Sequence, residues 1–136
     1  PQLKLVSLNQ SLIDGRGLRH LAGLQRLDTY LKGCPISDEA IAASLPSLVR
    51  LRRLSLSSTG VTDRGLETIA ACEELEDLRL SRTGVTDATL EILERLPKLS
   101  ALYVVGTKTS RERLAKLKQR KTGLWIYSDH LEDLVV

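Results

Sequence analysis

Histidine and cysteine, the side chains that most often perform catalysis or bind metals, are rare in this sequence. The two histidines, His20 and His130, lie near opposite ends of the chain, and no motif that would hold a general base beside a nucleophile surrounds either of them. Cys34 and Cys72 have no partner at metal-ligand spacing. No glycine-rich phosphate-binding loop occurs. We therefore predict a protein that is not an enzyme and has no catalytic residues, no metal site and no cofactor.

Aspartates recur along the chain at intervals of 24 or 25 residues: Asp14, Asp38, Asp63 and Asp87. A row of carboxylates can bind Ca²⁺. However, Thr62 and Thr86 directly precede two of these aspartates, and threonine followed by aspartate is typical of a helix start, where a negative charge interacts favourably with the helix dipole. We favour helix starts over a metal site.

Basic residues are concentrated near the C-terminal end, where they make up seven of the fourteen residues 108–121. They are Lys108, Arg111, Arg113, Lys116, Lys118, Arg120 and Lys121. Such a stripe could bind nucleic acid or another polyanion. The alternative is an exposed last helix whose buried side carries Leu114 and Leu117. We favour this second interpretation, because the aromatic residues of a nucleic-acid motif do not accompany the basic ones.

These residues belong to a repeat with a period of 24. Residues 59–66 (TGVTDRGL) and 83–90 (TGVTDATL) are nearly identical, and five leucines fall at the same phase: Leu3, Leu27, Leu51, Leu75 and Leu99. Five 24-residue turns thus cover residues 3–122, followed by a capping strand and tail at 123–136. We predict that residues 1–136 form a single domain.

Each turn changes its hydrophobic period once. An LxxLxL stretch ends in strand-like alternation, and the later apolar residues have helical spacing. Residues suited to helix capping lie between the two: Asp14, Ser37, Thr62, Thr86 and Ser110. A small side chain, for example Thr59, also recurs shortly before the capping residue. We expect it to form a hydrogen bond with the backbone of the neighbouring turn. The second turn is slipped by one residue, so we expect a bulge or altered loop around residues 30–35.

These motifs resemble the leucine-rich-repeat family. The form LxxLxLxxTxVTDxGLxxL is similar to its cysteine-containing and ribonuclease-inhibitor-like branch, which includes F-box-associated, coupling-factor-B-like and bacterial planctomycete-type repeat proteins. The resemblance implies an α/β fold: a right-handed solenoid with a parallel sheet on the concave side and helices on the convex side. It also implies a protein-protein interaction module, acting alone or as a recognition or assembly subunit of a larger complex.

In such a solenoid, positions 2, 3, 5, 7 and 8 of each turn face outward from the concave sheet. They bring together Arg52, Arg53, Arg79, Arg82 and Tyr103, residue types that are enriched at binding hot spots. We predict that these five residues bind another protein. Two alternatives remain: a solvated face with cross-strand ion pairs such as Arg52–Glu76 and Arg53–Asp77, and a nucleic-acid or polyanion surface formed with the basic helix.

The ends of the chain depart from the repeat. We predict that Trp125 and Tyr127 cover the C-terminal end of the core as lids, and that the tail at 129–136 caps this end rather than docking on a partner. The N-terminal edge has no cap, so we expect upstream residues or another subunit to cover it. No apolar run is long enough to span a membrane, and two cysteines without a disulfide pattern favour an intracellular, cytoplasmic protein.

Overall fold

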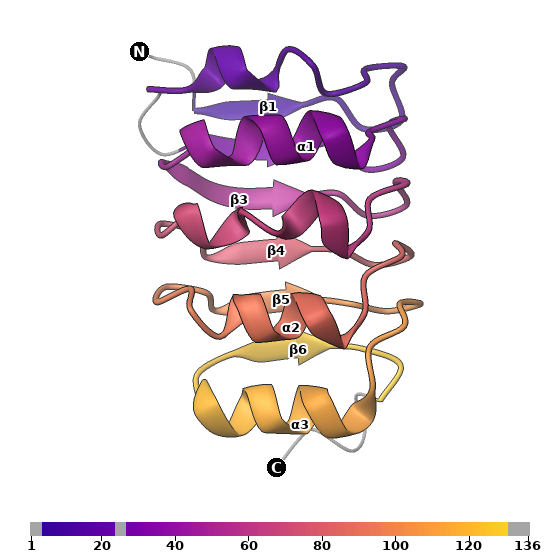
Figure 1. Ribbon diagram of the computed structural model, residues 1–136, viewed down its shortest axis with the longest axis vertical. Coiled ribbons are helices and arrows are strands. Elements are labelled where there is room, and N and C mark those ends of the chain that lie inside the picture. The colour runs from indigo at the N-terminus through magenta and orange to yellow at the C-terminus, as the bar shows by residue number, and fades with distance from the viewer. Residues whose placement is uncertain (1–3, 24–26, 131–136) are drawn as a thin grey trace.

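Six short parallel strands form one sheet in the computed structural model, which describes residues 4–23 and 27–130. The strands follow one another across the sheet in chain order, so β1 and β6 are its two edges (Figure 1). Their bounds are Leu5–Ser7 (β1), Leu27–Tyr30 (β2), Leu51–Ser55 (β3), Asp77–Arg79 (β4), Ala101–Tyr103 (β5) and Trp125–Tyr127 (β6). This is the sheet that the 24-residue period predicts.

Helical segments connect consecutive strands and all pack on the same face of the sheet (Figure 1). The α-helices are Asp38–Ser44 (α1), Asp87–Leu93 (α2) and Arg111–Arg120 (α3); the 3₁₀ segments are Leu18–Leu21 (η1), Leu45–Ser47 (η2), Asp63–Leu66 (η3) and Ile69–Ala71 (η4). The first and third connections are thus 3₁₀ rather than α-helical. Glycines at 15, 17 and 65 lie in or just before these segments, and glycine lowers helix propensity.

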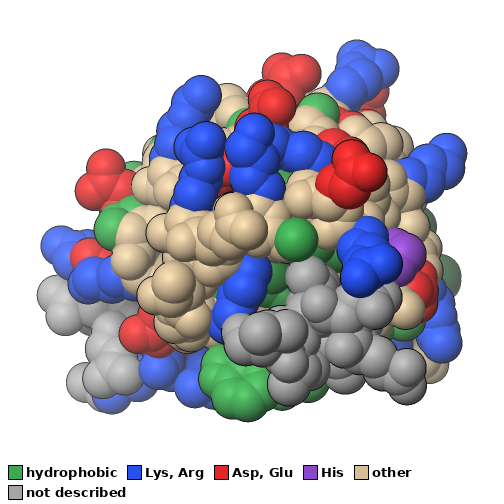
Figure 2. Space-filling model, turned by 90° about the horizontal axis from the view of Figure 1, so that it is seen from below, with side chains coloured by type: hydrophobic (Ala, Val, Ile, Leu, Met, Phe, Trp, Pro, Cys, Tyr) green, Lys and Arg blue, Asp and Glu red, His purple; other side chains and the backbone are tan. Residues whose placement is uncertain are grey.

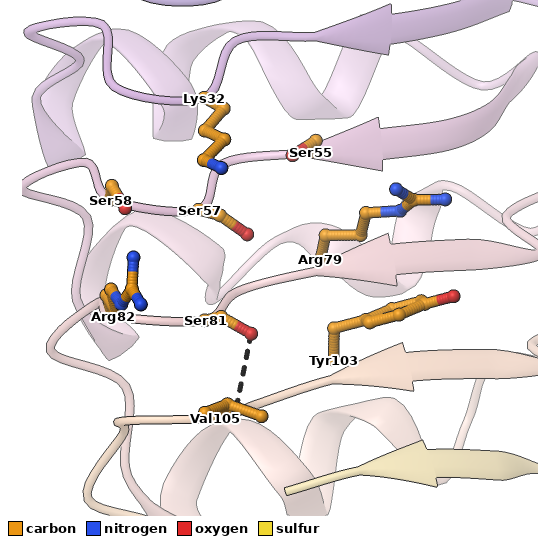
Figure 3. Close-up of a pocket in the computed structure, with 9 residues that line it drawn as sticks. All are labelled: Lys32, Ser55, Ser57, Ser58, Arg79, Ser81, Arg82, Tyr103 and Val105. Atoms are coloured by element: carbon orange, nitrogen blue, oxygen red, sulfur yellow. Dashed lines mark hydrogen bonds between the residues drawn. The ribbon is translucent and has the colours of Figure 1, made fainter.

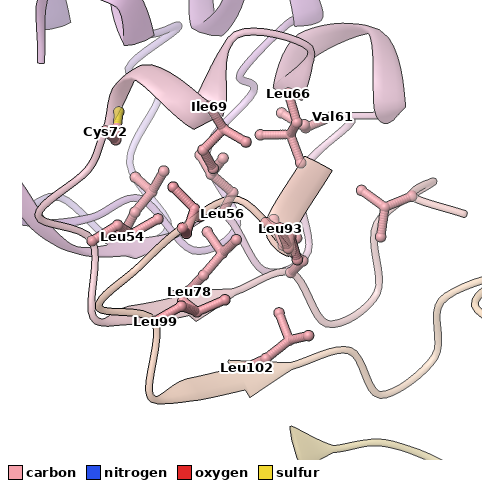
Figure 4. Close-up of a cluster of buried hydrophobic side chains, with 14 of the residues drawn as sticks. Leu54, Leu56, Val61, Leu66, Ile69, Cys72, Leu78, Leu93, Leu99 and Leu102 are labelled. Carbon is pink, nitrogen blue, oxygen red and sulfur yellow. The ribbon is translucent and has the colours of Figure 1, made fainter. Parts of the chain in front are cut away.

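The core lies between the sheet and the helical segments and is built mainly from leucine (Figure 4). Leu54, Leu78 and Leu102 are directly opposite one another on neighbouring strands, and each is at most 2% exposed. The predicted strand phase is therefore correct. Cys34 and Cys72 are free and buried, as expected for small apolar side chains.

The irregularity of the second turn lies earlier than predicted. Leu27 pairs with Leu51, but Asp28 pairs with Arg53, so the extra residue Arg52 forms a bulge at the start of β3. From that point the second turn is one residue short. The helical side of the second turn regains this residue and restores the 24-residue length. There η2 begins seven residues after Asp38, whereas in the third turn η4 begins six residues after the equivalent Asp63.

Aspartates at three helix starts link the second, third and fourth turns to the turn that follows each of them. The carboxylate of Asp38 accepts hydrogen bonds from the Thr62 backbone N–H (2.7 Å) and hydroxyl (2.6 Å). Asp63 binds Thr86 in the same way, and Asp87 binds Ser110. We call Asp38, Asp63 and Asp87 the aspartate ladder. A Cβ at Gly65 would lie 2.6 Å from a carboxylate oxygen of Asp38, so glycine permits this close approach.

Most of the predicted capping residues are caps. The side chains of Ser37, Thr62, Thr86 and Ser110 each accept a hydrogen bond from a backbone N–H in the first turn of the helix that follows. Asp14 is the exception. It accepts from the backbone N–H of Arg16, and the residue that precedes η1 is Gly17, which makes no side-chain cap.

The recurrent small side chain after each strand mostly bonds its own turn, contrary to our expectation. The threonine hydroxyls donate to the carbonyl three residues earlier, in the pairs Thr59–Leu56, Thr83–Leu80 and Thr107–Val104. These bonds close the tight turn where the chain leaves the sheet. Only Cys34 behaves as predicted, because its thiol donates to the Leu8 carbonyl of the preceding turn (2.9 Å).

Candidate interaction surface on the concave face of the sheet

The sheet face turned away from the helices is open, and we call it the concave face. The register places one residue from each of the strands β2 to β6 directly opposite the next: Tyr30, Ser55, Arg79, Tyr103 and Tyr127. We call these five residues the central row. Short parallel strands position them because residues with the same repeat phase point to the same face. The row runs from β2 to β6.

Aromatic and arginine side chains stack within the central row. The rings of Tyr103 and Tyr127 lie 4.4 Å apart at 5°, and the Arg79 guanidinium lies 4.7 Å from the Tyr103 ring centroid and 5.9 Å from that of Tyr30. Because β5 lies between β4 and β6, Tyr103 has Arg79 on one face and Tyr127 on the other. Burial within this stack raises the pKa of Tyr103.

Trp125 and Tyr127 do not cover the end of the core, which corrects our prediction. Their neighbour Ile126 points into the core, while Trp125 is 66% and Tyr127 38% exposed. Strand alternation decides this, because residues on either side of an inward Ile126 must face outward. Both aromatic residues therefore extend the concave face toward β6. The tail at 131–136 lies outside the described residues, so its predicted capping stays a prediction.

Ion pairs neutralise part of the predicted arginine cluster. Arg52 donates two hydrogen bonds to the buried carboxylate of Asp28 (3.2 and 2.9 Å) and lies 3.6 Å from Glu76. The predicted Arg52–Glu76 pair is thus present. Arg79 makes two hydrogen bonds to Asp77 (3.0 and 3.3 Å), which raise the pKa of its guanidinium.

Arg53 is exposed and has a different partner from the one predicted. It lies opposite Asp77 in the register, but in the described part of the chain the ion-pair partner of Asp77 is Arg79. Contact with the Tyr30 side chain, followed by the charges of Asp28 and Asp77, raises the pKa of Arg53. Arg53 is therefore more accessible to a partner than Arg52 or Arg79.

A hollow of about 310 Å³ lies on the concave face where the strands end (Figure 3). The side chains that line it are Lys32, Ser55, Ser57, Ser58, Arg79, Ser81, Arg82, Tyr103 and Val105. The structure thus brings three of the five predicted binding residues, Arg79, Arg82 and Tyr103, to one place, and leaves Arg52 and Arg53 outside it. Sequence analysis missed Lys32 because the slipped second turn obscures its phase.

The backbone turns sharply at the rim of this hollow. Gln10, Ser58 and Arg82 have φ values of 58°, and Gly33 and Gly106 also have positive φ. All five occupy the same place in successive turns, three residues after the last residue of the strand. A left-handed residue there is therefore a feature of the repeat, and two glycines at this place in the sequence were the signal for it.

The basic C-terminal segment is largely paired within the protein. Arg113 lies near Glu91 and Glu94, at 3.6 and 3.7 Å, and Arg120 lies 3.0 Å from Glu94. The amines of Lys118 and Lys121 donate to backbone carbonyls at the ends of helical connections. Figure 2 looks along the stack from the end that carries β6 and shows acidic side chains among the basic ones. This arrangement favours the exposed-helix interpretation of α3.

The N-terminal edge exposes apolar side chains. Leu5 on β1 is 53% exposed and Leu12 is 94% exposed. The prediction that another segment or subunit covers this edge stays a prediction. In the described ranges, no three histidine, cysteine or acidic residues are grouped as a metal site would need, and no helix there has the length and hydrophobicity of a membrane span.

Comparison with family models and with curated proteins finds no match. Among solved structures, a leucine-rich-repeat protein of Leptospira interrogans matches 91% of this chain with a TM-score of 0.65 and 21% sequence identity. The chain has the fold of a leucine-rich-repeat protein. It spans 31% of the length of that neighbour. Identity at this level shows the fold of the solenoid alone, so the predicted cysteine-containing or ribonuclease-inhibitor-like subtype stays a prediction.

Proposed function

We propose that this solenoid is a non-catalytic protein-interaction module that binds a partner protein through its concave face. The observation that carries the proposal is the exposed aromatic end of the face, where Trp125 and Tyr127 lie beside the Arg79–Tyr103 stack. Aromatic residues and arginine contribute most at protein interfaces because they bury large areas with little loss of conformational freedom. Arg53 and Arg82 add charge at the borders of this surface.

Nucleic-acid or polyanion binding is the weaker candidate. Bases bind by stacking on open aromatic faces, yet both faces of the Tyr103 ring are already in contact with Arg79 and Tyr127. Arg52 and Arg79 are paired with carboxylates, and so are Arg113 and Arg120 of α3.

The protein-interaction module would serve as a recognition or assembly subunit of a larger complex. Its cytoplasmic location stays a prediction.

Site-specific photo-crosslinking tests this proposal. A photoreactive phenylalanine analogue replaces Trp125 on the concave face or, as the matched control, Arg95 on the helix side. Both proteins are irradiated in lysate of the source cells, with and without prior nuclease treatment. We expect protein adducts from position 125 and few from position 95. Adducts that form equally at both positions, or that disappear after nuclease treatment, would contradict the proposal.

A substitution at the same surface provides a second measurement. Changing Arg53 to glutamate and Trp125 to alanine should weaken capture of the crosslinked partner by roughly thirtyfold or more, because a hot-spot truncation costs about 2 kcal/mol or more. Both side chains are exposed, so the fold should persist. We avoid Arg52 and Arg79 for this purpose, because removing either leaves Asp28 or Asp77 without its ion-pair partner.

A further inference from the structure

The hollow on the concave face is lined by several hydrogen-bond donors that have no partner in the described part of the chain. In the described part of the chain, the Lys32 amine and the Arg82 guanidinium have no ion-pair or hydrogen-bond partner, and neither do the hydroxyls of Ser55, Ser57 and Ser58. The Ser81 hydroxyl accepts from the Val105 backbone N–H (3.2 Å) and keeps its own proton free to donate. None of the residues that line the hollow is acidic.

These donors are directed toward one place in the hollow. Figure 3 shows the Lys32 amine directed toward Ser57 from one side and the Arg82 side chain rising toward the same segment from the other. Ser55 and Ser57 are only 4% and 8% exposed, so their hydroxyls lie at the bottom of the hollow and the two cations at its border. A ligand there would meet positive charge at the rim and hydroxyl donors beneath.

We propose that this hollow binds a phosphorylated serine or threonine side chain of the partner protein. The inference rests on the proposed function, because it assigns the chemistry of the group that the concave face recognises. A phosphate monoester carries nearly two negative charges and three strong acceptor oxygens at neutral pH. Two free cations and four hydroxyls can satisfy those oxygens, whereas a carboxylate offers only two.

The surroundings of the hollow favour a protein as the source of the phosphate. Arg79 and Tyr103 form one wall and continue into the exposed Tyr127 and Trp125, so residues flanking the phosphorylated side chain would bury apolar surface on this aromatic end. A nucleic-acid strand would need its bases stacked, and the hollow itself has no free aromatic face for them, because the one aromatic residue of its lining, Tyr103, is in contact with Arg79 and Tyr127.

Fluorescence anisotropy with degenerate peptide pools tests the inference. The probes are three labelled pools of one design whose fixed central residue is phosphothreonine, threonine or glutamate, together with a labelled oligothymidylate. The proteins are the wild type, a Lys32→Gln/Arg82→Gly variant and an Arg95→Gln/Lys116→Gln variant. The last two remove the same charge, but the control removes it from the helix side. Glycine suits the positive φ at position 82, so the first variant should fold, which circular dichroism verifies.

The expected result is that the phosphothreonine pool binds at least about tenfold more tightly than the threonine pool, since each charge-assisted bond contributes a factor of roughly 10 to 100. The Lys32/Arg82 variant should lose this difference, and the helix-side control should keep it. Equal binding of the phosphothreonine and threonine pools would overturn the inference, and so would an unchanged preference in the Lys32/Arg82 variant. Equal binding of the glutamate pool would show carboxylate recognition instead, and tighter binding of the oligothymidylate would show a nucleic-acid surface.

Failure of this inference is separable from failure of the proposed function. If the peptide pools show no phosphate preference while crosslinks still form at position 125, the concave face binds a partner by other chemistry. If crosslinks at position 125 are also absent, the interaction-module proposal itself fails.

Discussion

Replacing Asp63 with alanine should destabilise the protein more than any other single change at a partly exposed acidic residue. The Asp63 carboxylate accepts hydrogen bonds from the Thr86 backbone N–H (2.8 Å), the Thr86 hydroxyl (2.6 Å) and the Thr89 hydroxyl. Thr89 is fully buried. The variant therefore leaves a buried hydroxyl and a backbone N–H without their acceptor, and it removes the side-chain link between the third and fourth turns.

The magnitude follows from these contacts. A hydrogen bond to a charged group contributes about 1.5–3 kcal/mol, and a buried polar group left unpaired costs about 1–3 kcal/mol. The three bonds share one carboxylate, so their contributions do not add fully. We expect the free energy of unfolding at pH 7 to fall by about 3 kcal/mol, a large part of the 5–15 kcal/mol that is typical of a domain.

The loss should depend on pH in a defined direction. Burial raises the pKa of Asp63, but the hydrogen bonds from Thr86 and Thr89 outweigh it and hold the pKa below the ordinary 3.8. The unfolded chain therefore takes up the proton first as the pH falls, and the stabilisation by the carboxylate, complete at neutral pH, is lost below about pH 4. The difference in the free energy of unfolding between the wild type and the Asp63→Ala variant should therefore narrow in that acidic range.

Urea denaturation followed by circular dichroism measures both the loss in the free energy of unfolding at pH 7 and its dependence on pH. A double-mutant cycle with Thr89→Val isolates the bond between the Asp63 and Thr89 side chains. The control substitution is at the partly exposed Asp14, which bonds Arg16 of its own turn, and it should shift the midpoint little. A loss below about 1 kcal/mol at pH 7, or a gap of constant size down to the lowest pH, would refute the reasoning.

Three further predictions concern single positions. Thr29→Val should raise the free energy of unfolding by about 1–2 kcal/mol in urea denaturation, because the buried Thr29 hydroxyl has no partner in the described structure; a decrease would show that the hydroxyl is satisfied. Ser58→Gly should raise it by about 0.5–1 kcal/mol, since φ is 58° and glycine avoids the left-handed penalty at some entropic cost; Ser57→Gly is the control and should not stabilise. Burial raises the pKa of Cys72 to about 12, so this thiol should react with Ellman's reagent at pH 8 only as fast as the protein unfolds, and rapid native labelling would contradict its burial.

The sequence by itself determined the architecture of this protein. A 24-residue period and a change from strand-like to helical spacing predict strands that repeat in phase, and Leu54, Leu78 and Leu102 are aligned and buried as that phase requires. Local chemistry also determined the helix starts, because a serine or threonine oxygen caps the helix that immediately follows it. The capping by Ser37, Thr62, Thr86 and Ser110 needs only neighbours in sequence.

Only the tertiary structure decided how the turns contact one another. The aspartate ladder joins residues 23 to 26 positions apart, and a helix-start motif fits a capping charge and an inter-turn acceptor equally well. The bulge at Arg52 depends on pairing between β2 and β3. The hollow depends on the same strand pairing, because the slipped second turn sets where Lys32 lies relative to Arg82. Contacts between turns depend on register and stacking, and a pattern read along one chain contains neither.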